Sequence, residues 1–324
     1  MHNRSISRIR RRINRKIFSP LISPFYIDYN PDYRQSIFLA GSERSGTTWI
    51  SDIINHKREY RYIFEPFWPA KVDICEKFRF QQYLRPENQD RYFIEAVEAI
   101  LSGRIRNRWT DRYHRRFIAS KRLIKDVRAN LLLKWMHGNF PEMPIILILR
   151  HPCAVARSQL KKATYWIPDL KEEFLSQEEL VQDFLNPFAE EIGKAQTAFE
   201  IHIFRWCIQY YVPLKQFKRG EIHLAFYENF CEEPESEIDR LFSFLGKSYD
   251  EGAVFKKLRE PSPVSREVSA IISGGSLLDS WREQITDEQI QRAVEILRLF
   301  ELERIYSQDS LPDVEAVYDI IEAD

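Results

Sequence analysis

The sequence predicts an α/β fold, in which a central and mostly parallel β-sheet is flanked by helices. Three observations lead to this prediction. Short apolar runs of strand length alternate along the chain with longer segments of helical periodicity. A glycine-containing loop directly follows the first of these runs, which is typical of a phosphate site at a helix N-terminus. Strands that alternate with helices in this way form parallel sheets whose two faces are both covered.

The elements can be assigned in order along the chain. In the first half we expect a strand at 36–40, a helix at 46–55, a strand at 61–65 that Pro66 stops, a helix at 88–102, a short strand at 123–125, and a helix through Leu131, Leu132 and Trp135. In the second half we expect a strand at 145–149, a helix that Pro152 opens, one long aromatic helix over 187–218, a strand at 222–227, and closing helices at 236–245 and 286–305. The charged stretch 160–186 predicts a helical insertion, or a lid over the site.

The chain of 324 residues is long enough to bury a substantial core. We expect one folded domain over 33–306, between a basic N-terminal arm at 1–32 and a flexible acidic tail at 307–324. No apolar run approaches the ~18 residues that a membrane-spanning helix needs. The four cysteines are scattered and form no CxxC pair. This argues against a metal site or a disulfide framework, and it suits a reducing compartment such as the cytoplasm.

The basic arm allows two interpretations. Residues 1–20 carry seven lysine and arginine residues and no acidic residue. The isoleucines at positions 6, 9, 13 and 17 form one apolar stripe at helical spacing. Such a helix could lie on an anionic membrane surface as a peripheral contact. The alternative is a solvated tail, or an arm docked on the acidic surface of the protein itself.

The segment GSERSGTTW at 41–49 has the outline of a phosphate-binding loop. Gly41 and Gly46 have the spacing of the pattern GxxxxGK[ST], but Thr47 stands where that pattern has lysine. The lysine reaches the outer phosphates of a nucleoside triphosphate, so we do not expect ATP hydrolysis. The backbone N–H groups, the two threonine hydroxyls and Arg44 suit a single terminal phosphate better than a metal-bound triphosphate.

Two segments resemble the sulfotransferases, which use 3′-phosphoadenosine 5′-phosphosulfate (PAPS). RSGTTW at 44–49 resembles their 5′-phosphosulfate loop, and its arginine is similar to that of tyrosylprotein, carbohydrate and many bacterial members rather than cytosolic ones. ILILRHPCAVARS resembles their second motif, an arginine at a strand end and a serine eight residues later, here Arg150 and Ser158. The resemblance spans roughly 36–300. It implies a P-loop NTPase-like sulfotransferase fold.

The resemblance also implies roles for individual residues. Arg44 would neutralise the charge that develops on the departing 5′-phosphate. Arg150 and Ser158 would hold the 3′-phosphate, with His151 and Arg157 as alternates. Further implied contacts of the cofactor are Ser45, Gly46, Thr47, Thr48, Tyr227 in AFYEN, Ser265 and Arg266, together with Trp49, which would flank the adenine or else pack the loop helix against the sheet.

The acceptor hydroxyl must lose a proton, and the histidine segment KTHxP of cytosolic members is absent. Glu65 in YIFEPF is similar to the glutamate of the other branch of the family. Among its aromatic neighbours we expect its pKa to be raised, as a general base needs. Asp126 and His114 remain alternative bases, and Lys125 could contact the sulfuryl oxygens.

The resemblance therefore implies an enzyme that transfers a sulfuryl group from PAPS to a hydroxyl and releases 3′-phosphoadenosine 5′-phosphate (PAP). The arginine loop and the glutamate favour a carbohydrate-like acceptor over a small phenol. We expect no metal and no nucleic-acid partner. Two other functions stay open: a nucleotide kinase or NTPase, which the missing loop lysine disfavours, and an inactive binding module held at a membrane by residues 1–20.

Overall fold

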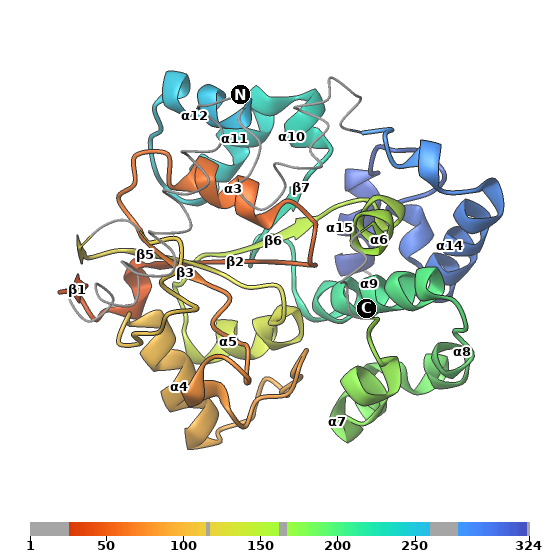
Figure 1. The fold of residues 1–324 in the computed structure, drawn as a ribbon, viewed down its shortest axis with the longest axis horizontal. Helices are drawn as coiled ribbons and strands as arrows, with labels where there is room; N and C mark the ends of the chain where they lie inside the picture. Colours follow the sequence, from red (N-terminus) through yellow and green to blue (C-terminus); the bar gives the residue numbers. More distant parts are fainter. Residues whose placement is uncertain (1–25, 115–116, 162–166, 260–277, 323–324) are drawn as a thin grey trace, which may run out of the picture.

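The computed structural model describes residues 26–114, 117–161, 167–259 and 278–322. Its centre is a five-stranded sheet with the strand order β3-β5-β2-β6-β7 (Figure 1). All the pairings in this sheet are parallel. Its strands are β2 (Ser36–Gly41), β3 (Arg61–Phe64), β5 (Arg122–Lys125), β6 (Ile145–Leu149) and β7 (His223–Phe226). A separate parallel pair joins β1 (Ile27–Asp28) to β4 (Ile118–Ala119).

Helices fill the crossovers that parallel strands require. Between β2 and β7 they are α3 (Thr47–Ile54), α4 (Arg91–Leu101), α5 (Leu133–Asn139), α6 (Pro152–Leu160), α7 (Glu178–Leu180), α8 (Ala189–Gly193) and α9 (Ala198–Gln216). After the last strand follow α10 (Asn229–Glu232), α11 (Pro234–Phe244), α12 (Glu251–Leu258), α14 (Asp287–Leu299) and α15 (Val314–Glu322). The predicted alternation of strands and helices around a parallel sheet is confirmed.

The strands send alternate side chains into two apolar layers. In β2, Ile37 and Leu39 join the layer made with α3, α11 and α12. Phe38 and Ala40 join the layer made with α4, α5 and α9. Figure 1 shows these two groups of helices on opposite faces of the sheet. Because both faces are covered, a central strand such as β6 is apolar and buried along its whole length.

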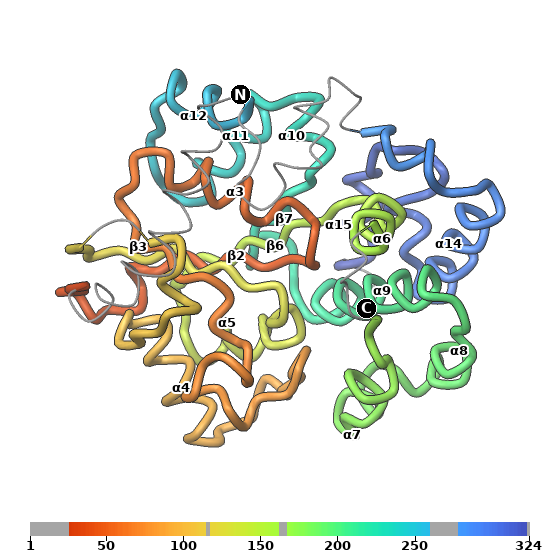
Figure 2. Tube along the Cα trace, viewed as in Figure 1, coloured from red at the N-terminus to blue at the C-terminus, as the bar shows by residue number. Residues whose placement is uncertain are grey.

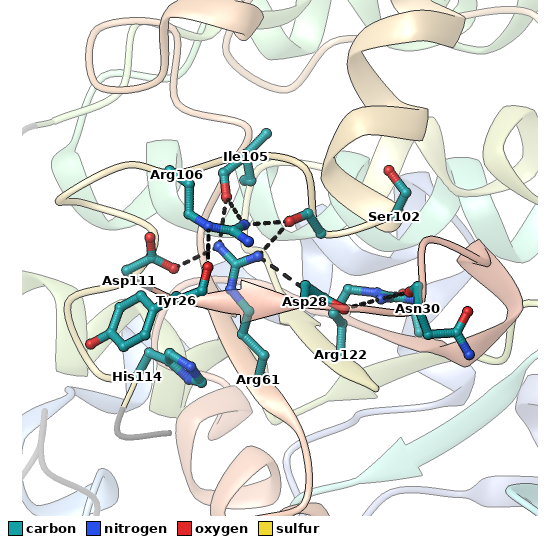
Figure 3. Close-up of polar contacts among 12 residues, drawn as sticks. Tyr26, Asp28, Asn30, Arg61, Ser102, Ile105, Arg106, Asp111, His114 and Arg122 are labelled. Atoms are coloured by element: carbon teal, nitrogen blue, oxygen red, sulfur yellow. Dashed lines mark hydrogen bonds and ion pairs between the residues drawn. The ribbon is translucent and has the colours of Figure 1, made fainter. Parts of the chain in front are cut away.

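Two fully buried arginines stand at the first positions of β3 and β5, at the end of the sheet opposite the glycine loop. Arg122 donates to Asp28 at 2.8 Å, and Arg61 donates to Asp111 at 2.8 Å. Figure 3 shows the two guanidinium groups between the segments that carry these aspartates. Each buried cation thus meets a carboxylate, and the network anchors both segments to the edge of the sheet.

The expected single helix over 187–218 is wrong, because the chain forms α8 and then a separate α9. The break comes from a capping box at Thr197 and Glu200. The Thr197 hydroxyl accepts the backbone N–H of Glu200 at 3.2 Å, and the Glu200 carboxylate accepts that of Thr197 at 3.0 Å. Such a pair of side chains satisfies the unpaired N–H groups of a helix start and therefore begins a new helix. Figure 2 shows α7 and α8 beside α9.

The acidic residues at 307–324, expected as a flexible tail, contain the helix α15, which packs against α9. Ala316, Val317, Ile320 and Ile321 are buried. These apolar residues recur at helical spacing while the acids occupy the other face, so the acidic composition concealed an amphipathic helix. Of the basic arm expected at 1–32, residues 1–25 lie outside the described residues, and Ile27–Asp28 belong to the fold as strand β1. Within the described ranges, none of the helices has both the length and the apolar character needed to cross a bilayer.

Candidate active site

The glycine loop connects the carboxyl end of β2 to α3. Gly41 ends β2, and Gly46 is the N-cap residue of α3. Since β2 lies between β5 and β6, the loop opens among the carboxyl ends of three adjacent strands. Ligands of open parallel sheets bind in this position. The first turn of α3 presents N–H groups that have no partner within the helix, which suits an anion.

Only glycine fits at position 46. Its φ of 95° is in the left-handed region, and a Cβ there would lie 2.6 Å from Cδ2 of Tyr227. Arg44 also has a left-handed backbone, with φ of 77°. Such a conformation in a non-glycine residue carries strain and is most often found at functional sites.

The loop is fastened to β6 and α9 by a buried tyrosine. The Tyr210 hydroxyl accepts the backbone N–H of Ser42 at 2.9 Å and donates to the carbonyl oxygen of Ile148 at 2.7 Å. The Ser45 hydroxyl donates to the Ser42 carbonyl at 2.8 Å, which closes the turn from inside. The aromatic character of 187–218 predicted only a helix, and this contact of Tyr210 with the loop was not expected.

Both residues of the second motif lie against this loop. Nε of Arg44 donates to the Ser158 hydroxyl at 2.9 Å, and Nη1 of Arg150 donates to the Arg44 carbonyl at 3.1 Å. The guanidinium carbon of Arg150 lies 3.9 Å from the centre of the Tyr227 ring, which is a cation–π contact. Among the described residues, buried Nε of Arg150 has no hydrogen-bond partner. Arg150 is therefore held beside the loop with donor capacity to spare.

Trp49 packs on the inner side of the loop helix. It is 6% exposed, and its ring lies 5.4 Å from that of Tyr227 and 6.4 Å from that of Phe230, measured between centroids. This placement favours the packing interpretation of Trp49 over an adenine contact. Thr47 and Thr48 form the first turn of α3, as the motif predicts.

The alternates for the 3′-phosphate are engaged elsewhere. The His151 ring accepts the backbone N–H of Cys153 at 3.2 Å, caps α6, and stacks on Trp281. Nε of Arg157 donates to Gln284 at 3.0 Å.

Burial raises the pKa of the Cys153 thiol to about 12, so this cysteine is a structural residue. Ser265 and Arg266 lie outside the described residues.

Glu65 directly follows β3 and has a left-handed φ of 44°. Its Oε1 accepts from Lys125 Nζ at 2.6 Å, and its Oε2 accepts from Arg128 Nη1 at 2.8 Å. Burial by itself raises the pKa of Glu65, but the two ion pairs outweigh burial and lower the pKa to about 2. The expected raised pKa is therefore wrong. The sequence analysis counted the aromatic neighbours of Glu65 and did not weigh the two cations.

Of the other candidate bases, Asp126 is less accessible than Glu65, and His114 is equally buried but lies beside another part of β3. Asp126 is fully buried, and its carboxylate accepts the backbone N–H groups of Phe67 at 2.8 Å and Arg128 at 2.6 Å. Burial raises the pKa of Asp126 to about 6, but the carboxylate is enclosed by the turns after β3 and β5. His114 lies beside Tyr62 of β3, whose backbone N–H it accepts at 3.4 Å, among the residues drawn in Figure 3.

Two half-buried tryptophans adjoin Glu65. Nε1 of Trp109 donates to the backbone carbonyl of Glu65 at 2.9 Å. The rings of Trp68 and Trp109 meet edge to face, with centroids 4.5 Å apart. The Arg128 guanidinium lies 4.3 Å from the centre of the Trp68 ring. The candidate base is thus bordered by cations and by aromatic rings.

Arg128, Glu43 and Arg205 are charged residues of the site that the sequence analysis missed. Arg128 Nη2 lies 3.3 Å from Glu43 Oε1, and Arg205 Nη1 lies 3.4 Å from Glu43 Oε2. Two features of the sequence could have pointed to them: Glu43 is a carboxylate inside the glycine loop, and Arg205 is an arginine among the aromatic residues of 187–218. Within the described ranges, no three His, Cys, Asp or Glu side chains gather as metal ligands.

Comparison with known proteins identifies the family. The sulfotransferase-domain family matches residues 34–307. Nodulation protein NoeE of Sinorhizobium fredii (strain NBRC 101917 / NGR234) is 26% identical over 279 residues, which cover 80% of this chain and 63% of NoeE. This chain thus matches less than two thirds of that relative's length.

Solved structures of similar proteins are more distant in sequence. The sulfotransferase domain from the curacin biosynthetic pathway is 14% identical with a TM-score of 0.45, over 81% of this chain and 96% of that one. Mouse sulfotransferase SULT7A1 complexed with PAP is 13% identical with a TM-score of 0.44, over 93% of this chain and 90% of that one. On the family match over residues 34–307, the chain belongs to the sulfotransferase-domain family.

Proposed function

We propose that this chain transfers a sulfuryl group from PAPS to a hydroxyl of a carbohydrate-like acceptor. One observation carries the proposal. Arg44 and Ser158 are 114 residues apart and Arg44 and Arg150 are 106 apart, yet all three meet at the glycine loop. Two separate groups of anion-binding donors at one site suit a nucleotide with phosphates at both its 5′ and 3′ positions.

The residues present fit such a nucleotide. A Cβ at Gly46 would close the cradle against Tyr227, and the buried Nε of Arg150 has no partner among the described residues. Arg44, the backbone of 45–48 and the start of α3 would hold the 5′ side, and Arg150 with Ser158 would hold the 3′-phosphate. PAPS, when bound, supplies an activated sulfate whose bond to the 5′-phosphate is the bond that breaks.

Within this proposal Glu65 accepts the proton of the acceptor hydroxyl while the hydroxyl oxygen forms its bond to sulfur. Arg44 neutralises the charge left on the 5′-phosphate, and Lys125, which is paired with Glu65, would contact the sulfuryl oxygens. Although the pKa of Asp126 is raised to about 6 and that of Glu65 is lowered to about 2, Asp126 is fully buried and His114 lies beside Tyr62, whereas Glu65 is 8% exposed; these placements favour Glu65 as the base.

The tryptophans support a carbohydrate-like acceptor. Trp68 and Trp109 are half-buried next to Glu65, so each ring keeps part of its surface for a ligand. Apolar ring faces beside charged hydrogen-bonding groups match a sugar, which has C–H surfaces as well as hydroxyls.

Calorimetry and a transfer assay test the proposal. We expect PAP to bind without added metal, and ATP with Mg²⁺ to bind much more weakly. Radiolabelled PAPS should transfer sulfate to members of a panel of mono- and oligosaccharides in preference to simple phenols. Glu65→Gln should bind PAP like the wild type and lose about 100-fold or more in transfer rate. Binding of ATP with Mg²⁺ alone would instead indicate a nucleotide kinase or NTPase.

A further inference from the structure

Glu43 poses an electrostatic problem, since it places a carboxylate inside a loop that binds an anion. It lies between Ser42, which Tyr210 anchors, and Arg44, and its backbone carbonyl accepts from Gln159 Nε2 at 3.1 Å. An unpaired negative charge here would repel a phosphate. Its side chain is 18% exposed and pairs with two arginines. A carboxylate retained in such a place needs a role other than holding the donor.

The two arginines connect Glu43 to the candidate base on one side and to α9 on the other. Arg128 bridges Glu43 and Glu65, with the shorter contact, 2.8 Å, to Glu65 and the longer, 3.3 Å, to Glu43. Arg205 of α9 bridges Glu43 at 3.4 Å and Glu173 at 2.8 Å. The charges therefore alternate in sign along one continuous row: Lys125, Glu65, Arg128, Glu43, Arg205 and Glu173.

We propose that Glu43 and Arg205 are positioning residues for the base: Glu43 shares Arg128 with Glu65, and Arg205 shares Glu43 with Arg128, so together they determine how tightly the Arg128 guanidinium holds Glu65. This inference rests on the proposed function, in which Glu65 is the base. Glu43 draws Arg128 toward the loop and away from Glu65. Arg205 opposes this by occupying the other oxygen of Glu43, and Glu173 competes with Glu43 for Arg205.

The direction of each effect follows from the charges that face Glu65. These are Lys125 on β5, Arg128 after β5, Glu43 on the loop and the buried carboxylate of Asp126. Removing the negative charge of Glu43 leaves Arg128 wholly to Glu65, so Glu65 becomes a weaker base. Removing Arg205 takes a cation from Glu43, so Glu43 attracts Arg128 more strongly; this moves Arg128 off Glu65 and makes Glu65 a stronger base.

The test is kcat for transfer at pH 7 and saturating PAPS, measured for three variants together with the KM of the acceptor and the Kd of PAP. Because the pKa of Glu65 is about 2, Glu65 is ionised at this pH, and a change in its strength as a base alters kcat. Glu43→Gln should lower kcat by about threefold, and Arg205→Met should raise it by a similar factor, with KM and Kd unchanged. The double variant should resemble Glu43→Gln alone, since Arg205 acts through Glu43. Independent charges acting through space would instead give changes that add.

Two further variants keep the test decisive if Arg205→Met does not fold. Glu173→Gln leaves Arg205 more fully to Glu43, so its kcat should fall as that of Glu43→Gln does. Arg205→Lys keeps the charge and should restore most of the wild-type kcat. The control is Arg292→Met, which breaks the ion pair with Glu200 of α9 at 2.8 Å and should leave kcat unchanged.

The outcomes separate this inference from the proposed function. Opposite changes in kcat for Glu43→Gln and Arg205→Met, together with a double variant that matches Glu43→Gln, support the inference. Unchanged kcat, changes of the same sign, or changes that add in the double variant would overturn it and leave the function standing, provided that the variants still bind PAP and transfer sulfate. A wild-type chain that neither binds PAP nor transfers sulfate would remove both.

Discussion

Replacing Gly46 with alanine tests whether the nucleotide cradle depends on the absence of a side chain. At φ of 95° an alanine is strained by about 1–2 kcal/mol. The new Cβ would also lie 2.6 Å from Cδ2 and 3.1 Å from Cε2 of Tyr227, so the ring must move. Arg150 lies 3.9 Å over that ring and would lose its support.

The expected loss of PAP affinity follows from these contacts. The cation–π contact contributes about 1 kcal/mol, and a misaligned charged hydrogen bond to the 3′-phosphate costs about 2 kcal/mol. Together they amount to about 3 kcal/mol, or roughly 100-fold in the Kd of PAP. Calorimetric titration with PAP measures this change, and thermal unfolding measures the backbone strain separately.

Gly220→Ala is the matched control. Gly220 also has a left-handed φ, 87°, but a Cβ there meets nothing within 4 Å. Gly220→Ala should therefore lose about 1–2 kcal/mol of unfolding free energy, Gly46→Ala should lose more because of the added clash with Tyr227, and only Gly46→Ala should lose PAP affinity. The reasoning is refuted if Gly46→Ala binds PAP as tightly as the wild type, or if Gly220→Ala loses as much affinity.

Two other predictions concern a phosphate contact and a buried histidine. Arg150→Met should weaken the binding of PAP by about 100-fold and the binding of adenosine 5′-phosphate by less than about threefold, as measured by calorimetry. Equal losses of affinity for the two nucleotides would contradict a contact between Arg150 and the 3′-phosphate. Burial lowers the pKa of His223 to about 4 from an unfolded value of 6.5. The unfolded chain therefore binds the proton first, and the unfolding free energy falls as pH drops from about 6.5 toward about 4. His223→Phe removes this contribution. Between pH 7 and pH 5, the unfolding free energy measured with urea should therefore fall by about 2 kcal/mol less in the variant than in the wild type. An identical fall in both proteins would exclude His223 as a source of the pH dependence.

Local signals in the sequence predicted most of the fold. The strand at 145–149 occupies the expected residues, since a short apolar run before a proline-led helix has few other interpretations. The errors arose where one signal concealed another. Acidic composition concealed the apolar stripe of α15, and the aromatic run over 187–218 concealed the capping box at Thr197. In both places the pattern of single residues, rather than regional composition, determines the structure.

The donor side of the candidate site was predictable, but the environment of the base was not. Arg150 and Ser158 were expected together because a motif fixes their spacing and the parallel topology brings it to the loop. The pKa of Glu65 depends on register, because Phe64 pairs with Lys125 and the next residue is therefore placed beside that lysine. A single sequence does not show which residues pair across neighbouring strands, so the cations beside Glu65 were not predicted.

Sheet topology explains why Glu43 and Arg44, which are neighbours in the loop, contact residues that follow different strands. The loop leaves β2, the central strand, with β5 and β3 on one side and β6 and β7 on the other. Arg44 turns to Ser158, after β6, on the donor side. Glu43, one residue earlier, turns to Arg128, after β5, on the side of the base. The left-handed backbone of Arg44 separates these directions. We therefore expect that any movement of the loop also shifts the charge that Arg128 meets and, through Arg128, the surroundings of Glu65.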